Sequence, residues 1–113
     1  MAQKAETKFK EVFLKALRGI PQVWAEKIQQ VGKRGTPDIL ACVGGRFVGI
    51  ELKKDDKSPP DKLQQHKLKK IASAGGVSIV ACPENSETVI GMIAIMARSN
   101  KYDRVNMGAR KGP

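Results

Sequence analysis

Two carboxylates and a lysine lie on adjoining apolar segments at a spacing that predicts a metal site. Asp38 opens the segment 38–43, and Glu51 and Lys53 lie near the end of the segment 47–53. Gly44-Gly45 between the segments suits a two-residue hairpin turn, because glycine accepts the positive φ angles that such a turn requires. Counting outward from this turn places Asp38 directly opposite Glu51, on the same face of the hairpin.

Opposed carboxylates repel each other, and in an apolar hairpin they are also partly desolvated. Lys53 lies two residues beyond Glu51, hence on the same face, and neutralises one charge but not both. A hard divalent cation, Mg²⁺ or Mn²⁺, accounts for the rest; the backbone carbonyl of Leu52 is a third oxygen donor. The alternative is a solvated strand end with an incidental Lys–Glu pair, which the apolar surroundings argue against.

Helical periodicity adds Glu6 to this site. The segment 6–17 places Phe9, Phe13 and Leu17 on one stripe, and Glu6 falls within its sector. A carboxylate on a core-facing stripe is costly without a partner, so Glu6 is expected to reach the metal site. Glu11 is expected on the opposite, solvated face. The alternative for Glu6 is a charge that complements the helix dipole.

A second helix, predicted over residues 60–74, adds Gln64. The buried face of this helix is predicted to hold Leu63, Leu68, Ile71 and Ala74, with Gln64 near its middle and His66 pointing away. A core-facing amide must find hydrogen-bond partners, and a carboxylate or a metal-bound water would serve. The alternative is a glutamine whose amide is satisfied by the backbone.

The remaining elements complete an α/β (α+β) domain over residues 1–97. A strand is expected around 24–28 and a buried strand over 77–82. A helix that Asn85 or Ser86 caps is expected next, and its spacing, which favours a helix over a strand, places Val89, Met92, Ile93, Met96 and Ala97 on one face. Helices therefore flank a central mixed sheet, with the hairpin in the middle and covered on both sides. Residues 98–113 are expected to form a flexible basic tail.

Composition points to a large acidic partner. The 113 residues carry 21 Lys and Arg against 11 Asp and Glu, a net charge of +10, which suits nucleic acid or an anionic membrane surface. The apolar run 89–97 is far short of the roughly 20 residues that cross a bilayer. The N-terminus lacks the apolar core of a signal peptide, so a cytoplasmic protein is expected, with Cys42 and Cys82 as buried reduced thiols.

Basic residues near the acidic pair are candidates for contacts to a phosphate backbone. An ordinary solvated charged surface is the alternative, and the low aromatic content of 4% argues against a base-stacking platform. The expected contacts are Lys33, Arg34, Lys54, Lys57 and Lys67.

The combined motifs resemble the VRR-NUC family, a branch of the PD-(D/E)xK, restriction-endonuclease-like nucleases whose stand-alone members occur in bacteriophages and bacteria. The resemblance covers about residues 6–86 and is carried by Gly35-Thr36-Pro37-Asp38, Glu51-Leu52-Lys53, Leu63-Gln64 and Ala74-Gly75-Gly76. It implies a restriction-endonuclease-like core with Asp38 and Glu51 as metal ligands, Lys53 as catalytic lysine and Gln64 beside them. The family's first-helix acid would be Glu6, with Glu11 as the fallback.

The resemblance implies a Mg²⁺- or Mn²⁺-dependent DNA endonuclease. Small stand-alone relatives resemble Holliday-junction resolvases in acting as homodimers, so branched DNA is the expected substrate, in viral or bacterial replication, recombination or repair. The alternatives are a nicking, flap or degradative nuclease, or a basic DNA-binding module that keeps the fold without cleaving. The intact Asp38, Glu51 and Lys53 argue against the last, because binding alone needs no opposed carboxylates.

Overall fold

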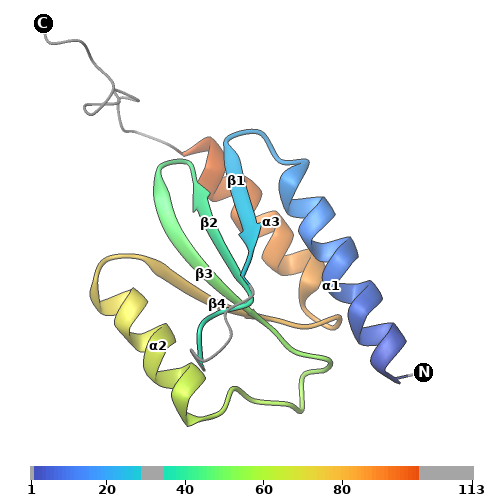
Figure 1. Ribbon diagram of the computed structural model, residues 1–113. Coiled ribbons are helices and arrows are strands. Elements are labelled where there is room, and N and C mark those ends of the chain that lie inside the picture. Colours follow the sequence, from blue (N-terminus) through green and yellow to red (C-terminus); the bar gives the residue numbers. More distant parts are fainter. Residues whose placement is uncertain (1, 29–34, 100–113) are drawn as a thin grey trace, which may run out of the picture.

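The computed structural model describes residues 2–28 and 35–99, which form a mixed four-stranded sheet between helices. The order along the sheet is β1-β2-β3-β4; β1, β2 and β3 are antiparallel, and β4 is parallel to β3. Helices α1 and α3 pack together on one face, and α2 lies on the other against β3 and β4 (Figure 1). The predicted α+β class with a flanked mixed sheet is confirmed. In chain order the elements are α1 (Ala2–Arg18), β1 (Val23–Lys27), β2 (Ile39–Val43), β3 (Arg46–Leu52), α2 (Lys62–Ser73), β4 (Val77–Ala81) and α3 (Ser86–Arg98).

The central hairpin has the predicted register. Its strands pair from Val43 with Arg46 at the turn to Ile39 with Ile50. Gly44 and Gly45 have φ angles of 55° and 89°, as the two-residue turn requires. The strand β2 begins one residue after Asp38, and there the backbone oxygen of Asp38 accepts a hydrogen bond from Ile28 N of the neighbouring chain segment.

The hydrophobic core lies between the sheet and the α1–α3 layer. Because side chains alternate along a strand, one face of β2 and β3 supplies Ile39, Ala41, Val48 and Ile50, all buried. The helices contribute the buried side chains Phe13 and Leu17 from α1 and Val89, Ile93 and Ala97 from α3. Met92, expected on the same face of α3, is instead 52% exposed, because it lies at the border of the buried stripe.

Helix α2 begins later than predicted and buries less. It starts at Lys62 behind an Asp61 cap, so Pro60 lies before the helix and not in its first turn. Leu68 is its buried residue, whereas Leu63 and Ala74 are exposed, because α2 covers only the β3–β4 side of the sheet. The edge strand β4 is half-buried for most of its length, and not fully buried as expected.

On the face of the sheet that carries α2, the strands β1 and β2 are left uncovered. This corrects the expectation that the hairpin is covered on both sides. A row of paired residues, Trp24, Cys42 and Phe47, crosses three strands there. Trp24 is 60% exposed and Phe47 is 47% exposed. Cys42 is therefore an exposed thiol, contrary to prediction, while Cys82 is buried as predicted.

The predicted cap of α3 forms differently. Asn85 lies at the cap position but makes no side-chain cap bond; its side chain instead accepts from Cys82 N and donates to Val80 O. Helix α3 continues through Arg98, and the rest of the predicted basic tail, from residue 100 onward, lies outside the described residues. None of the described helices has the length and apolar character that a membrane crossing requires.

A pair of glycine substitutions tests the packing of the hairpin turn. A Cβ on Gly44 would lie 2.8 Å from Met96 O and 2.9 Å from Ala97 O, at a φ of +55°. We expect Gly44→Ala to lower the free energy of unfolding by about 1–3 kcal/mol, because the clashing atoms are backbone.

Gly91 in α3 is the matched control for this substitution, since nothing lies within 4 Å of its added Cβ. Gly91→Ala should raise stability by about 0.5–1 kcal/mol, as expected for a helix interior. Denaturant unfolding of both variants measures the difference; equal effects would contradict the described contact between the turn and the end of α3.

Candidate active site

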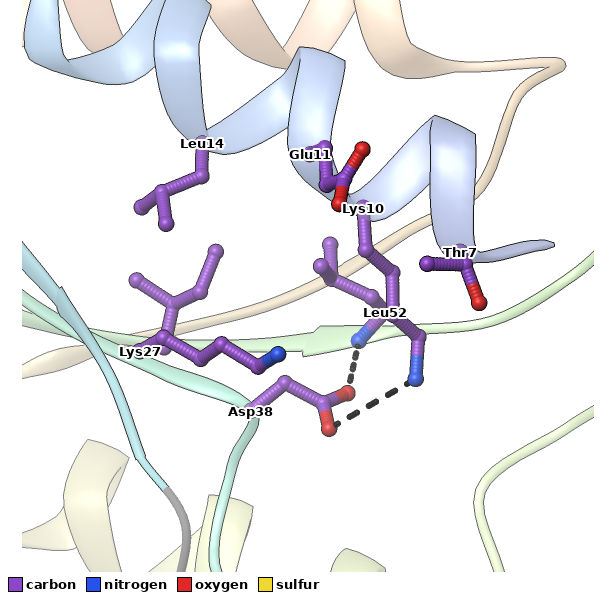
Figure 2. Close-up of a pocket in the computed structure, with 8 residues that line it drawn as sticks. Thr7, Lys10, Glu11, Leu14, Lys27, Asp38 and Leu52 are labelled. Atoms are coloured by element: carbon purple, nitrogen blue, oxygen red, sulfur yellow. Dashed lines mark hydrogen bonds and ion pairs between the residues drawn. The ribbon is translucent and has the colours of Figure 1, made fainter. Parts of the chain in front are cut away.

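Asp38 is held at the edge of the sheet by the backbone of the strand that carries Glu51. Its Oδ2 accepts a hydrogen bond from Leu52 N at 2.7 Å, and its Oδ1 lies 3.9 Å from Lys10 Nζ of α1. Figure 2 shows both interactions, with the Lys10 side chain extending from α1 to Asp38. Because Leu52 directly follows Glu51, this hydrogen bond brings the Asp38 carboxylate beside the Glu51 segment.

Glu51 is the one buried charged residue of the described chain, at 3% exposure. Its Oε2 accepts a hydrogen bond from Gln64 Nε2 at 2.7 Å and lies 3.5 Å from Lys53 Nζ. Burial, reinforced by repulsion from Asp38, raises the pKa of Glu51 from 4.5 to about 7, although Lys53 and Lys10 oppose the rise. Asp38 thus contributes to the raised pKa of Glu51, although the polar contacts of Asp38 are with Leu52 N and Lys10, and those of Glu51 are with Gln64 and Lys53.

Gln64 joins the acid and the lysine. Its Nε2 donates to Glu51, and its Oε1 accepts from Lys53 Nζ at 2.8 Å. The core-facing amide expected from the periodicity of α2 has found its partners in these two side chains. The alternative of a glutamine satisfied by the backbone is wrong for the amide nitrogen.

The acids of α1 are arranged differently from the prediction. Glu6 is 3.7 Å from Lys10 and does not line the cavity beside Asp38, whereas Glu11 does. The expectation that Glu11 points away from the site is therefore wrong, whereas its expected exposure to solvent is confirmed. The physical reason is that the cavity lies beside the buried stripe of Phe13 and Leu17 and not beneath it, so the flanking face of α1 lines it.

Two lysines that line this cavity were not predicted from the sequence. The cavity has a volume of about 220 Å³, and Lys10 and Lys27 line it together with Asp38, Thr7 and Glu11. Lys27 lies beside Asp38 because it pairs with Ile39 in the β1–β2 register. The sequence alone does not give the register between β1 and β2, so it could not place Lys27 at this cavity.

The motif around Asp38 is docked against the first turns of α2. Gly35 has a φ of 86°, and a Cβ there would lie 2.9 Å from the backbone of Leu63. Lys67 Nζ donates to Thr36 Oγ1 at 3.2 Å, which ties the same loop to α2. The glycine before Thr-Pro-Asp thus permits the close approach of this loop to the backbone of α2.

The predicted phosphate-contacting residues divide into three groups. Lys54 and Lys57 are exposed in the loop after β3, as a contact surface requires. Lys67 is half-buried and bonded to Thr36, so its ammonium is partly engaged within the protein. Lys33 and Arg34 lie outside the described residues.

The donor atoms at this site are hard oxygens. Among residues 2–28 and 35–99, no three His, Cys, Asp or Glu side chains gather at one point, so side chains alone supply two carboxylates. Within a strand, the N–H and C=O of one residue point to the same side. Because Leu52 N–H points to Asp38, its carbonyl is directed that way too. Two carboxylates, one carbonyl and waters are a donor set that fits Mg²⁺ or Mn²⁺.

Comparisons with known proteins give the fold a name. No family model and no curated protein matches the sequence. A solved structure named "VRR_NUC domain protein" superposes with a TM-score of 0.69 at 20% identity, over 89% of this chain and 94% of that one. A second, named "VRR_NUC domain", gives 0.65 at 21% identity, over 77% and 95%. The chain has the VRR_NUC fold.

In this VRR_NUC fold, two layers of the molecule converge on the ends of β2 and β3. Helix α1 brings Lys10 and Glu11 to Asp38 from one face, and α2 brings Gln64 to Glu51 from the other. The predicted resemblance is thereby confirmed at the level of the fold. Acidic oxygens next to the Lys53 ammonium form an arrangement that could bind a cation and a phosphate side by side.

Proposed function

We propose that this chain is a metal-dependent DNA endonuclease of the VRR-NUC family. The observation that carries the proposal is the buried Glu51, placed beside Asp38 and in contact with Lys53. A buried carboxylate with a raised pKa destabilises a protein at neutral pH, and a module that only binds DNA has no use for one. The two VRR_NUC neighbours support a nuclease domain by their fold.

The chain's residues divide the chemical work. Asp38, Glu51 and the Leu52 carbonyl would hold Mg²⁺ or Mn²⁺, which supplies Lewis acidity toward a phosphate oxygen and a bound water. Lys53 would donate to the phosphate oxygens on which negative charge builds. Gln64 holds Lys53 and Glu51 in place, and Lys10 and Lys27 would offset the charge of the phosphodiester.

The first-helix acid is assigned to Glu11 on the present geometry. It lines the cavity that Asp38 and Lys10 share, and its carboxylate could hold a water or a second metal ion. Glu6, the first choice from the sequence, would act only through Lys10, to which it is paired. Loss of cleavage in Glu11→Gln but not in Glu6→Gln would support this assignment.

The backbone of DNA is the expected partner of the surrounding positive charge. With a net charge of +10, the protein should bind the DNA phosphates without sequence specificity. Lys54 and Lys57 carry this role among the described residues, and Lys33 and Arg34 remain predictions. The setting we propose is replication, recombination or repair of bacterial or phage DNA.

Cleavage assays on defined DNA test the proposal. Four-way junctions, flaps, nicked duplex and linear duplex are incubated with Mg²⁺, with Mn²⁺ and with EDTA. We expect cutting of the four-way junction that EDTA abolishes. Preference for flaps or linear duplex would favour a flap or degradative enzyme, and binding without cutting of any substrate would favour the DNA-binding module.

We also propose that two copies act together, because one domain offers one site and symmetric cuts in a junction need two. The exposed row of Trp24, Cys42 and Phe47 is the surface that we expect the second copy to cover. Exposed aromatic side chains in one row are typical of interface cores.

A charged substitution in this row tests the dimer. Trp24→Asp should convert a dimer to a monomer, because it buries an unpaired charge in the interface. The matched control is Ile95→Asp on α3, which is similarly exposed at 58% but lies on another element. Light scattering after gel filtration measures the masses; a wild-type monomer, or a dimer that survives Trp24→Asp, would contradict this interface.

A further inference from the structure

We propose that Asp61, the residue before α2, is a positioning residue for the Glu51–Lys53 pair and acts through Gln64. This inference rests on the proposed function, because it assigns a role within the same site. It concerns a residue outside the Asp38, Glu51, Lys53 and Gln64 set. The inference starts from Gln64, which belongs both to the cap of α2 and to the candidate active site.

Asp61 and Gln64 form a reciprocal capping box at the start of α2. Asp61 Oδ1 accepts a hydrogen bond from Gln64 N at 2.8 Å, and Asp61 N donates to Gln64 Oε1 at 2.9 Å. In most capping boxes the side chain at this third helical position serves only the backbone. Here the same side-chain amide also accepts a hydrogen bond from Lys53 and donates one to Glu51.

Three hydrogen bonds define one orientation of the Gln64 side-chain amide. Its Oε1 receives the Asp61 N–H and the Lys53 ammonium, and its Nε2 donates to the Glu51 carboxylate. Turning the amide over would place its N–H groups against two donors and its oxygen against a carboxylate, which leaves every partner unsatisfied. The cap therefore selects the orientation that suits the acid and the lysine.

The effect of Asp61 must pass through Gln64. Among the described residues, no hydrogen bond or ion pair joins Asp61 to Glu51 or to Lys53, and Asp61 itself is exposed. Loss of the Asp61 side chain frees the Gln64 backbone N–H and loosens the first turn of α2. The Gln64 side chain then regains rotamer freedom, and Lys53 and Glu51 lose a fixed partner.

A purely structural role of Asp61 predicts something different, namely a general loss of helix stability. Removing an N-cap side chain destabilises the helix. Ala72→Gly, at an exposed position in the last turn of the same helix, also destabilises the helix but does not touch Gln64. Both variants therefore destabilise α2, and they differ in their connection to the site.

The experiment compares Asp61→Ala, Asp61→Asn and Ala72→Gly with the wild-type chain. The first readout is the order parameter of the Gln64 side-chain amide, measured by ¹⁵N relaxation on the metal-free protein. We expect a rigid amide in the wild type, in Ala72→Gly and in Asp61→Asn, whose oxygen caps equally well. In Asp61→Ala the amide should be mobile.

The second readout is steady-state cleavage of a four-way junction with Mn²⁺. We expect kcat of Asp61→Ala to fall about 10-fold with KM unchanged, as for other groups that orient a metal ligand from outside. Asp61→Asn and Ala72→Gly should stay within twofold of the wild type. If Asp61→Ala unfolds at the assay temperature, Asp61→Gly replaces it, since glycine at the cap position destabilises a helix much less than alanine does.

The outcomes separate this inference from the proposed function. A wild type that cleaves no DNA with any metal overturns the nuclease proposal, while the Gln64 order parameter still decides whether Asp61 fixes the amide. A rigid Gln64 amide in Asp61→Ala overturns the inference. Equal losses of kcat in Asp61→Ala and Ala72→Gly overturn it as well, because helix stability alone would then explain them.

Discussion

Replacing Lys53 by alanine is expected to reduce DNA cleavage at least 100-fold while DNA binding is retained. The Lys53 ammonium lies 2.8 Å from Gln64 Oε1 and 3.5 Å from Glu51 Oε2, so two partners hold it at the acidic pair. A preorganised cation at the reacting phosphate stabilises the transition state far more than it stabilises bound DNA, and removing one such donor typically costs about 10²–10³ in kcat.

The neighbouring Lys54 is the matched control for this prediction. It carries the same charge one residue along the chain but is exposed, so Lys54→Ala should weaken DNA binding slightly and leave kcat nearly unchanged. Single-turnover cleavage and binding titrations at one salt concentration measure both quantities. Similar effects of the two substitutions would show that Lys53 serves only as general positive charge.

Asp38→Asn extends the same test to the acidic side of the site. Asparagine keeps an oxygen that can accept from Leu52 N, whereas alanine would leave that N–H without its partner. We expect loss of cleavage with DNA binding kept or tightened, since a negative charge near the phosphate is removed.

The second large effect concerns stability. Glu51→Gln should make the metal-free protein more stable at pH 8 while abolishing cleavage. The pKa of Glu51 is raised from 4.5 to about 7, so the folded state holds this proton more tightly than the unfolded chain does. The stabilising contribution of the protonated group is complete below pH 4.5 and is lost as the pH rises through 7.

At pH 8 the ionised carboxylate therefore lowers the free energy of unfolding by about 3 kcal/mol, the equivalent of the shift from 4.5 to about 7. Glutamine carries no charge, and its oxygen can still accept from Gln64 Nε2, so most of this loss should disappear. Part of the gain is offset because Lys53 loses its acidic partner.

Thermal unfolding between pH 4 and 9 in EDTA measures this difference. The Tm of Glu51→Gln should exceed that of the wild type at pH 8 and approach it at pH 4. Glu84→Gln, on an exposed residue, is the control and should change little. Added Mn²⁺ should raise the wild-type Tm and leave Glu51→Gln unchanged; a Tm of Glu51→Gln below the wild type at pH 8 would contradict the raised pKa.

The hairpin could be predicted from the sequence because its information is local. Gly44-Gly45 fixes the turn, and a two-residue turn fixes the register of every pair that follows. The approach of Asp38 to Glu51 follows from the same count. The sequence did not reveal that the Asp38 side chain accepts a hydrogen bond from Leu52 N.

The α1 residues that line the cavity could not be identified from a helical projection, because their position depends on tertiary packing. A projection identifies the buried stripe but not where along or beside that stripe a cavity lies. Glu11 and Lys10 line the cavity because α1 flanks Asp38 with the face next to Phe13. The Asp61–Gln64 box was visible as an Asp-x-x-Gln pattern at the start of the predicted helix, and using that signal would have placed the start of α2 correctly.

Diffraction from crystals soaked in Mn²⁺ tests the central claim most directly, namely that a divalent cation binds between Asp38 and Glu51. We predict one strong anomalous peak in bonding contact with both carboxylates and with the Leu52 carbonyl oxygen, absent from crystals of Glu51→Gln. A peak held by other side chains, or crystals that bind no Mn²⁺ while Lys53 alone bridges the acids, would contradict the account.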